Sequence, residues 1–374
     1  MRSMATDLSR RAALGLLGGG LVLPFAGHAG QAGSLYLSAY GGKAGFGVAA
    51  FDYEAVIRYT FALPGRGHGF ACRPDGSAAV AFLRRPGSSA IVFDPRSGGH
   101  RLTIRATADR NFCGHGVYSA DGELLFATEA VGTTGDGVLG VYAVGENYQR
   151  IAEWPTHGLD PHEICLFPDG RHLAVANGGI MMRSDLPRMK LNIPDMDPSL
   201  VYLDTSNGEI KGRIQPPAEL HQLSIRHLVI DSSGRVIVAM QFEGAAGESV
   251  PLVATHEGVN AAHTGFHFPN FPAATLAAMN QYCGSVALSQ SGELAAITCP
   301  RGNLIVIYDR NRDQIAAMYT ISDVCGVAAA DCHGFRMSNG LGQLFRLNGS
   351  MTAASPAASV LWDNHITRVF AESA

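Results

Sequence analysis

The chain has 374 residues, of which 47% are hydrophobic and 16% are charged, and its formal net charge is −4. No run of lysine or arginine follows the first residues, so the composition argues against a nucleic-acid-binding surface. The 45 glycines exceed the roughly 26 that an average usage of about 7% would supply. This excess favours many tight turns between short strands.

The N-terminal segment has the features of an export signal. Arg10 and Arg11 precede an apolar run at residues 12–26, which small residues follow. Such a sequence is typical of a signal peptide, and the arginine pair resembles a twin-arginine signal. The run is shorter than the ~20 residues needed to cross a membrane. We therefore predict a signal peptide at 1–29, a single periplasmic domain at 30–374, and no membrane span after the signal is removed.

Six stretches of the chain share one pattern, in which two apolar runs flank an Asp-Gly, Asn-Gly or Ser-Gly turn. They begin at positions 68, 115, 162, 227, 285 and 333, so successive starts are 47, 47, 65, 58 and 48 residues apart. Apolar runs joined by such turns predict β-hairpins. The spacing is typical of four-stranded propeller blades of ~40–50 residues. The two longer steps predict insertions at 181–198 and 244–280.

Further apolar runs complete the predicted ring. Those at 35–61 and 359–362 lie outside the six stretches, and chain ends that share a blade would close the ring and leave few exposed edges. We therefore predict an all-β fold, a β-propeller of the WD40 or YVTN type with seven blades of four antiparallel strands; six or eight blades remain open. Residues 272–281 are the one stretch that could form an amphipathic helix.

Histidine recurs at one position of this repeat. In five of the six stretches, a histidine precedes the turn glycine by seven or eight residues. Equivalent positions of a propeller lie on a ring around its axis, so these side chains converge if they belong to the innermost strands. A further histidine near the C-terminus would join them. The predicted metal ligands are His68, His115, His162, His227, His333 and His365.

A second polar set is expected at the same end of the channel, because the second strand of each hairpin returns there. Together with arginines beside the histidines, its members are Arg66, Arg84, Arg85, Glu129, Asn177, Arg226, Gln241 and Arg301. Neutral imidazole ligates copper, iron, zinc and nickel, which predicts a metal site. The arginines keep a small-anion site open as an alternative, and histidines that only hold neighbouring blades together are a third.

The cysteine and glycine motifs argue against two classes of site, a zinc knuckle and a nucleotide-binding loop. The seven cysteines could form disulfides in an oxidising compartment, but their odd number leaves at least one unpaired. No Cys-x-x-Cys pair occurs, so a zinc knuckle is not supported. The glycine clusters are not followed by a strand–loop–helix unit, so no nucleotide cofactor is expected.

Several motifs match those of a known family. They are Arg66-Gly67-His68, Arg84-Arg85-Pro86, Phe112-Cys113-Gly114-His115-Gly116, Pro161-His162-Glu163, Val175-Ala176-Asn177-Gly178-Gly179-Ile180, Lys190-Leu191-Asn192, Ser224-Ile225-Arg226-His227-Leu228, Pro300-Arg301-Gly302-Asn303 and Trp362-Asp363-Asn364-His365. On these motifs, which cover nearly all of the mature chain, the sequence resembles the domain of unknown function 1513 family of exported, propeller-like proteins. Asn111 departs from the family pattern, which has a histidine there, and Cys113 replaces a more usual aromatic residue. The resemblance implies imelysin-like periplasmic partners and, by association, iron handling.

Three functions remain open on these grounds. We favour a monomeric, non-enzymatic propeller that binds iron or copper in metal acquisition. The second is a metal-dependent oxidoreductase or hydrolase, in which Glu129 or Glu163 would act as acid or base beside the metal. The third is a protein-interaction propeller whose histidines are structural.

Overall fold

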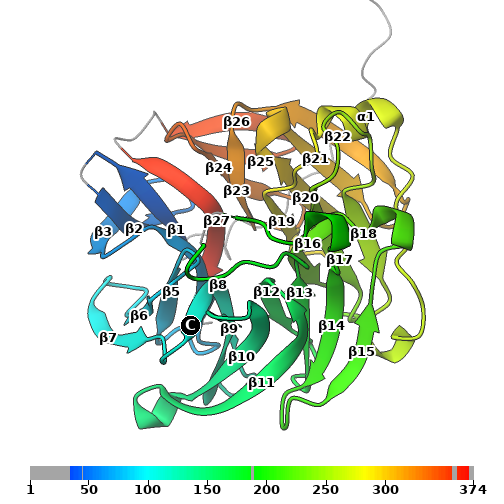
Figure 1. Cartoon of the computed structure of the whole chain (residues 1–374). Helices are drawn as coiled ribbons and strands as arrows, with labels where there is room; N and C mark the ends of the chain where they lie inside the picture. Colours follow the sequence, from blue (N-terminus) through cyan, green and yellow to red (C-terminus); the bar gives the residue numbers. More distant parts are fainter. Residues whose placement is uncertain (1–33, 44, 187–188, 356–359, 370–374) are drawn as a thin grey trace, which may run out of the picture.

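A computed structural model describes residues 34–43, 45–186, 189–355 and 360–369, and the predicted signal peptide lies outside them. Seven antiparallel sheets surround a central axis (Figure 1). Six of these sheets have four strands and one has three. The predicted all-β, seven-bladed propeller is therefore confirmed. No helix in the described residues has the length and apolar character that a membrane crossing requires.

The first four blades contain the strands β1 (Leu35–Gly42), β2 (Gly45–Asp52), β3 (Ile57–Leu63), β4 (Gly67–Cys72), β5 (Ala79–Leu83), β6 (Ser89–Phe93), β7 (His100–Arg105), β8 (Arg110–Tyr118), β9 (Leu124–Val131), β10 (Asp136–Ala143), β11 (Gln149–Leu159), β12 (Pro161–Leu166), β13 (His172–Asn177), β14 (Ser199–Asp204) and β15 (Ile210–Ile214). The other three contain β16 (Leu223–Ile230), β17 (Val236–Phe242), β18 (Val253–His256), β19 (Ser285–Leu288), β20 (Leu294–Cys299), β21 (Leu304–Asp309), β22 (Gln314–Thr320), β23 (Val324–Ala329), β24 (Phe335–Asn339), β25 (Leu344–Asn348) and β26 (Ser350–Ser355). The remaining strand, β27 (Leu361–Val369), belongs to the first blade. The helices are α1 (Ala273–Ala278) and the 3₁₀ turns η1 (Val144–Glu146), η2 (Ile193–Asp195), η3 (Ala218–Leu220), η4 (Val259–Ala261) and η5 (Pro300–Gly302).

Each blade changes from buried strands near the axis to half-exposed strands at the rim. All five side chains of β5 are buried, whereas those of β22 alternate between exposed and half-buried. Strands that are covered on both faces are continuously apolar, and strands covered on one face alternate. The turn glycines Gly76 and Gly122 have φ angles of 68° and 74°, a region that glycine adopts without steric cost.

The two ends of the chain share one blade, as predicted. The sheet order is β27-β1-β2-β3, so the C-terminal strand is the innermost strand of the blade that the N-terminal strands begin. Leu35 pairs with Val369 and Gly41 with Leu361. The Ser38 hydroxyl also donates a hydrogen bond of 2.8 Å to the backbone oxygen of His365. Closure thereby places a histidine from the last strand at the channel.

Two insertions interrupt the regular blades where the longer repeat steps predict them. The connection between β13 and β14 holds η2, and Figure 1 shows it, in green, passing over the centre of the ring. The region around β18 holds η4 and α1, which lies within the predicted helical stretch. All seven cysteines are free thiols.

Polar contacts between turns join neighbouring blades. Arg73, which follows β4, donates to the Gly122 carbonyl at 3.0 Å and to Oε1 of Glu123 at 2.9 Å in the next blade. The guanidinium of Arg310, at the β21–β22 turn, contacts the carboxylate of Asp231, at the β16–β17 turn, and both side chains are buried. Breaking a buried pair of this kind is costly because one charge loses its partner.

The Asp231–Arg310 pair should make folding stability depend on pH in the acid range. Burial raises the pKa of Asp231, but hydrogen bonds from Ser233 and Arg310 outweigh it and hold the pKa below its ordinary value. A depressed pKa stabilises the folded state above the unfolded-state pKa of about 3.9, and this contribution is lost as pH falls below that value. We expect Asp231→Asn to lower the free energy of unfolding by about 1–3 kcal/mol at pH 7, with a smaller loss at pH 3.

Urea unfolding of the wild type and the variant at pH 7, 5 and 3 measures this difference. Asp185→Asn, which removes an exposed carboxylate paired with Arg183, is the control and should change stability by less than about 0.5 kcal/mol. An equal loss for Asp231→Asn at all three pH values would contradict the assignment.

Candidate metal centre in the channel

Five histidines of the predicted set lie on innermost strands. They are His68 on β4, His115 on β8, His162 on β12, His227 on β16 and His365 on β27. The register of each strand with its neighbour shifts at or directly beside the histidine. Such β-bulges re-aim side chains and often adjoin functional sites. The repeated irregularity therefore turns the same residue of five blades toward one space.

The five imidazoles form one buried cluster, and none is more than 6% exposed. Contacting pairs have ring centroids 4.6–6.0 Å apart. Two groups of three, His68-His115-His162 and His115-His227-His365, each have one nitrogen per residue within 4.8 Å of the others. His115 belongs to both groups and is the centre of the cluster.

The two remaining blades contribute small residues. Ser285 begins β19, and its Oγ lies 3.4 Å from Nδ1 of His365. The register shift of β23 falls at Cys325 and Gly326, and a Cβ at Gly326 would lie 2.9 Å from Cγ1 of Ile366. The space left by these residues allows the His365 ring to reach His227, with centroids 4.7 Å apart.

His333, the sixth predicted ligand, does not join this cluster. It lies in the turn before β24, its side chain is 58% exposed, and its Nε2 is 2.8 Å from Oε2 of Glu293. The Asn-Gly turn after it joins the second and third strands of its blade, whereas the other matching turns join the first and second. The stretch that contains His333 therefore has the same sequence pattern as the others, but its turn lies one strand further from the axis of the propeller.

The carboxylate of Glu163 bridges two of the imidazoles. Its Oε2 accepts the Leu228 backbone N–H at 3.1 Å and lies 2.9 Å from Nδ1 of His227. Its Oε1 lies 3.6 Å from Nδ1 of His115. An oxygen that already accepts one N–H favours the Nδ1–H tautomer of His227, which leaves Nε2 as the free base. A carboxylate behind the imidazole is the usual support of a metal-binding histidine.

Two other histidines have charged neighbours. Oδ1 of Asp363 lies 3.9 Å from Nδ1 of His68, and its Oδ2 accepts a hydrogen bond from Nε of Arg66. A guanidinium nitrogen of Arg226 lies 3.4 Å from Nδ1 of His162. Arg66 is thus connected to the cluster through Asp363.

Electrostatics keeps the five imidazoles neutral. Burial lowers the pKa of each, and nearby imidazoles or arginines lower the pKa of most of them further. Burial also raises the pKa of Glu163 to about 8, against the hydrogen bond from Leu228, so this group carries a proton at neutral pH unless a cation lies nearby to favour the carboxylate form. Neutral imidazole is the form that binds a metal ion.

Some buried ring nitrogens lack a partner. Within the described residues, Nε2 of His115 and Nε2 of His365 are buried and have no hydrogen-bond partner. Buried polar atoms in proteins usually have a hydrogen-bond partner, and these two lie side by side in one cluster of imidazoles. A donor set of neutral imidazoles that includes these two free nitrogens fits a transition-metal ion.

A cavity of about 310 Å³ opens directly beside three of these histidines. Five cationic side chains line it: Arg84, Arg85, Lys190, Arg226 and Arg301. Gln241, Tyr282 and Asn364 complete its polar wall, and none of the described carboxylates lines it. The structure thus brings four of the predicted arginines and Gln241 to the mouth of the channel.

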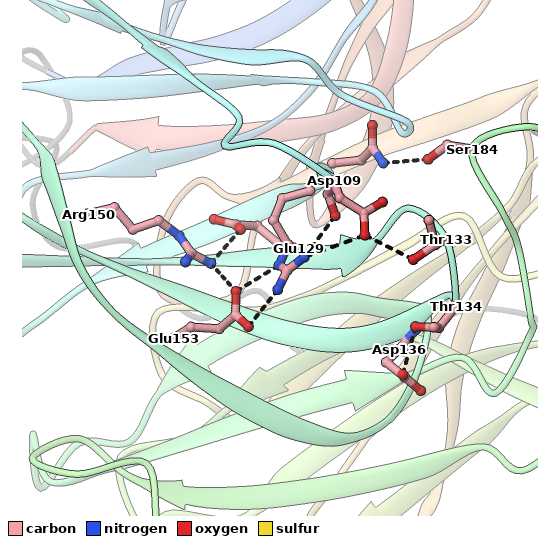
Figure 2. Close-up of polar contacts among 10 residues, drawn as sticks. Asp109, Glu129, Thr133, Thr134, Asp136, Arg150, Glu153 and Ser184 are labelled. Atoms are coloured by element: carbon pink, nitrogen blue, oxygen red, sulfur yellow. Dashed lines mark hydrogen bonds and ion pairs between the residues drawn. The ribbon is translucent and has the colours of Figure 1, made fainter.

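Two of the predicted polar residues lie elsewhere. Glu129 is fully buried within its blade, where it accepts hydrogen bonds from Tyr142 and, at 2.9 Å, from Arg150. Figure 2 shows the network continuing from Arg150 to Glu153. Asn177 donates to the Thr156 carbonyl at 2.9 Å. Successive side chains of a strand point to opposite faces, and these two lie on faces between blades.

A second cavity of about 220 Å³ shares Arg84 and Arg85 with the first and includes Cys113. Asn111 lines it and donates a 2.7 Å hydrogen bond to Ser184, outside the histidine cluster. The departure from the family pattern at Asn111 thus leaves the five imidazoles intact.

Sequence reasoning missed Lys190 and Asp363 as members of the site and considered Glu163 only as an acid or base. Glu163 and Asp363 lie within two residues of ring histidines, so their proximity in sequence was a usable signal. Lys190 comes from the insertion between β13 and β14, and although Lys190-Leu191-Asn192 is one of the family motifs, it lies outside the repeat that predicts which residues reach the channel.

Comparison with known proteins places the chain in a family. The model of the family described as "Protein of unknown function (DUF1513)" matches residues 61–369. The chain belongs to this family. The match confirms the resemblance noted in the sequence, and all five clustered histidines of this DUF1513 protein lie within the matched range.

No curated protein matches the chain. Among solved structures, it is similar to Kuenenia stuttgartiensis hydrazine synthase, with a TM-score of 0.60 and 15% sequence identity over 83% of this chain and 90% of that one. At this identity the similarity supports the fold alone.

Proposed function

We propose that this DUF1513 protein is a metal-binding propeller that holds one transition-metal ion, copper or iron, in its histidine cluster. The observation that carries the proposal is the pair of buried, unpartnered Nε2 atoms of His115 and His365 inside a group of five neutral imidazoles. Burying polar nitrogens without partners costs free energy, and a bound cation would remove that cost.

The surroundings of the five histidines favour coordination of a metal ion over a purely structural role in which the imidazoles pack against one another. A histidine with a purely structural role normally forms hydrogen bonds to other protein groups through both of its ring nitrogens. Here Glu163 holds the Nδ1 side of His115 and His227, so their Nε2 atoms remain for an ion. His115 is the shared ligand of both groups of three, and we assign it the central role.

An all-nitrogen donor set narrows the choice of metal. Imidazole suits copper, zinc, iron and nickel, and the affinity of such sites rises along the first row to Cu²⁺. We therefore expect Cu²⁺ to bind most tightly in vitro. Whether copper or iron is bound in the cell depends also on availability in the compartment that the N-terminal segment selects, which we propose is the periplasm. A role in metal acquisition, with imelysin-like partners, is part of the same proposal.

The direct test is metal loading of the purified full chain. After stripping with a chelator, the protein is incubated with Cu²⁺, Fe²⁺ or Zn²⁺, desalted and assayed for metal content and melting temperature. We expect about one ion per chain. At a free metal concentration of 100 times Kd, the stabilisation should be about 2.7 kcal/mol. Absence of retained metal together with an unchanged melting temperature for all three ions would refute the proposal.

A further inference from the structure

We propose that the cavity at the channel mouth binds a small dianion, a molecule with two or more negatively charged oxygens, next to the metal ion. The inference rests on the proposed metal site for its biological meaning, but its own evidence is the charge and shape of the cavity. Five cationic side chains and three ring histidines line the same space of about 310 Å³. This volume lies at the lower end of small-molecule sites.

The cationic charge of the cavity is only partly balanced by the protein. Glu243 pairs with Lys190 and with Arg226, whose Nη2 lies 3.4 Å from Oε1. Asp160 contacts Arg85 and lies 3.8 Å from Arg226. Neither carboxylate lines the cavity. Among the described residues, two carboxylates therefore form ion pairs with the five cations, and both lie behind the cavity wall.

Two of the cations form no ion pair in the described part of the chain. In the described part of the chain, no carboxylate lies within ion-pair distance of Arg84 or Arg301. The Arg301 guanidinium instead lies over the Tyr282 ring, 4.8 Å from its centroid. Burial and the neighbouring Arg66 lower the pKa of Arg84, and the negative charge of Asp363 offsets part of this effect. Unbalanced guanidinium groups that converge in a partly enclosed space form a typical binding site for carboxylates and oxyanions.

The position of the cavity links this ligand to the metal ion. His68, His162 and His227 line the cavity and also belong to the histidine cluster. An anion held by Arg84, Arg226 and Arg301 would therefore approach the cluster from its open side. An oxalate-like dicarboxylate or an inorganic oxyanion has the negatively charged oxygens that these guanidinium groups would bind. The two classes of anion differ in size and geometry.

The binding of oxalate and of phosphate to the full chain tests the inference by calorimetry, with chloride as the background salt. Each anion is titrated into the metal-free and the metal-loaded protein. The test variant is Lys190→Met with Arg301→Gln, since both residues line the cavity and neither belongs to the histidine cluster. We expect the double variant to bind the anion at least 10-fold more weakly and to retain its metal content. The control, Arg312→Gln, removes an exposed arginine outside the cavity and should bind as the wild type does.

The outcomes separate the two proposals. The inference is supported if the wild type binds the anion and the double variant binds it more weakly. This holds for the metal-free and the metal-loaded protein, and it also holds if no metal is retained and the metal proposal fails. Tighter binding of oxalate than phosphate would identify a dicarboxylate, and the reverse an inorganic oxyanion. Absence of binding in both forms, or equal affinity in wild type and double variant, would overturn the inference even when metal is bound.

Discussion

Replacing His115 by alanine should abolish stoichiometric retention of the metal ion. His115 belongs to both groups of three imidazoles and its Nε2 is one of the buried nitrogens without a partner, so its loss leaves neither of these groups intact. Loss of a supporting contact alone typically costs 10–100-fold in metal affinity, and we expect loss of this ligand to cost ~100-fold or more. Competition with a metal-responsive chelator dye measures the affinity.

His333→Ala provides a matched control for this variant. It removes a histidine with the same local sequence pattern, but one that is exposed and paired with Glu293. It should leave the affinity unchanged within the error of the measurement. Circular dichroism establishes that both variants are folded, and His227→Gln gives a second ligand variant of more similar shape. Equal metal affinity in wild type and His115→Ala would exclude the cluster as the metal site.

Truncating Trp362 to alanine should destabilise the propeller by about 3–5 kcal/mol, the usual cost of removing a large buried aromatic side chain. Trp362 is 4% exposed on the closing strand β27 and packs against Phe51, with ring centroids 5.6 Å apart. Its loss weakens the contact between the last strand and the N-terminal strands. Urea unfolding at pH 7, followed by fluorescence or circular dichroism, gives the free energy of unfolding.

Leu361→Ala is the control on the same strand. Leu361 is 52% exposed, so its truncation should change the free energy by less than about 0.5 kcal/mol. Because His365 follows on β27, we also expect Trp362→Ala to weaken metal binding, while Leu361→Ala should not. Similar unfolding curves for the two variants would show that closure by β27 contributes little to stability.

The blade plan follows from local sequence. Turn glycines at regular spacing and apolar runs between them predict hairpins without reference to any distant contact. The repeat spacing then predicts the propeller, and the additional apolar runs at the two ends predict the shared blade. All of these features depend on residues within a few positions of one another, and the structure confirms the architecture.

The membership of the site depends on strand position, which local sequence only partly encodes. His115 and His333 precede similar turns, but one turn follows an innermost strand and the other follows the second strand of its blade. Glu129 and Asn177 were expected at the channel from their distance to the turn. The two-residue period of a strand instead directs them to faces between blades.

The sequence by itself determined the repeat, the propeller architecture and the histidines of the regular hairpins, and it favoured seven blades. Only the tertiary structure decided that Ser285 and Gly326 leave space for His365, that Glu163 supports His115 and His227, and that Lys190 reaches the cavity from an insertion. The physical reason is that hairpins form from short-range preferences, whereas convergence on the channel requires all seven blades to close around one axis.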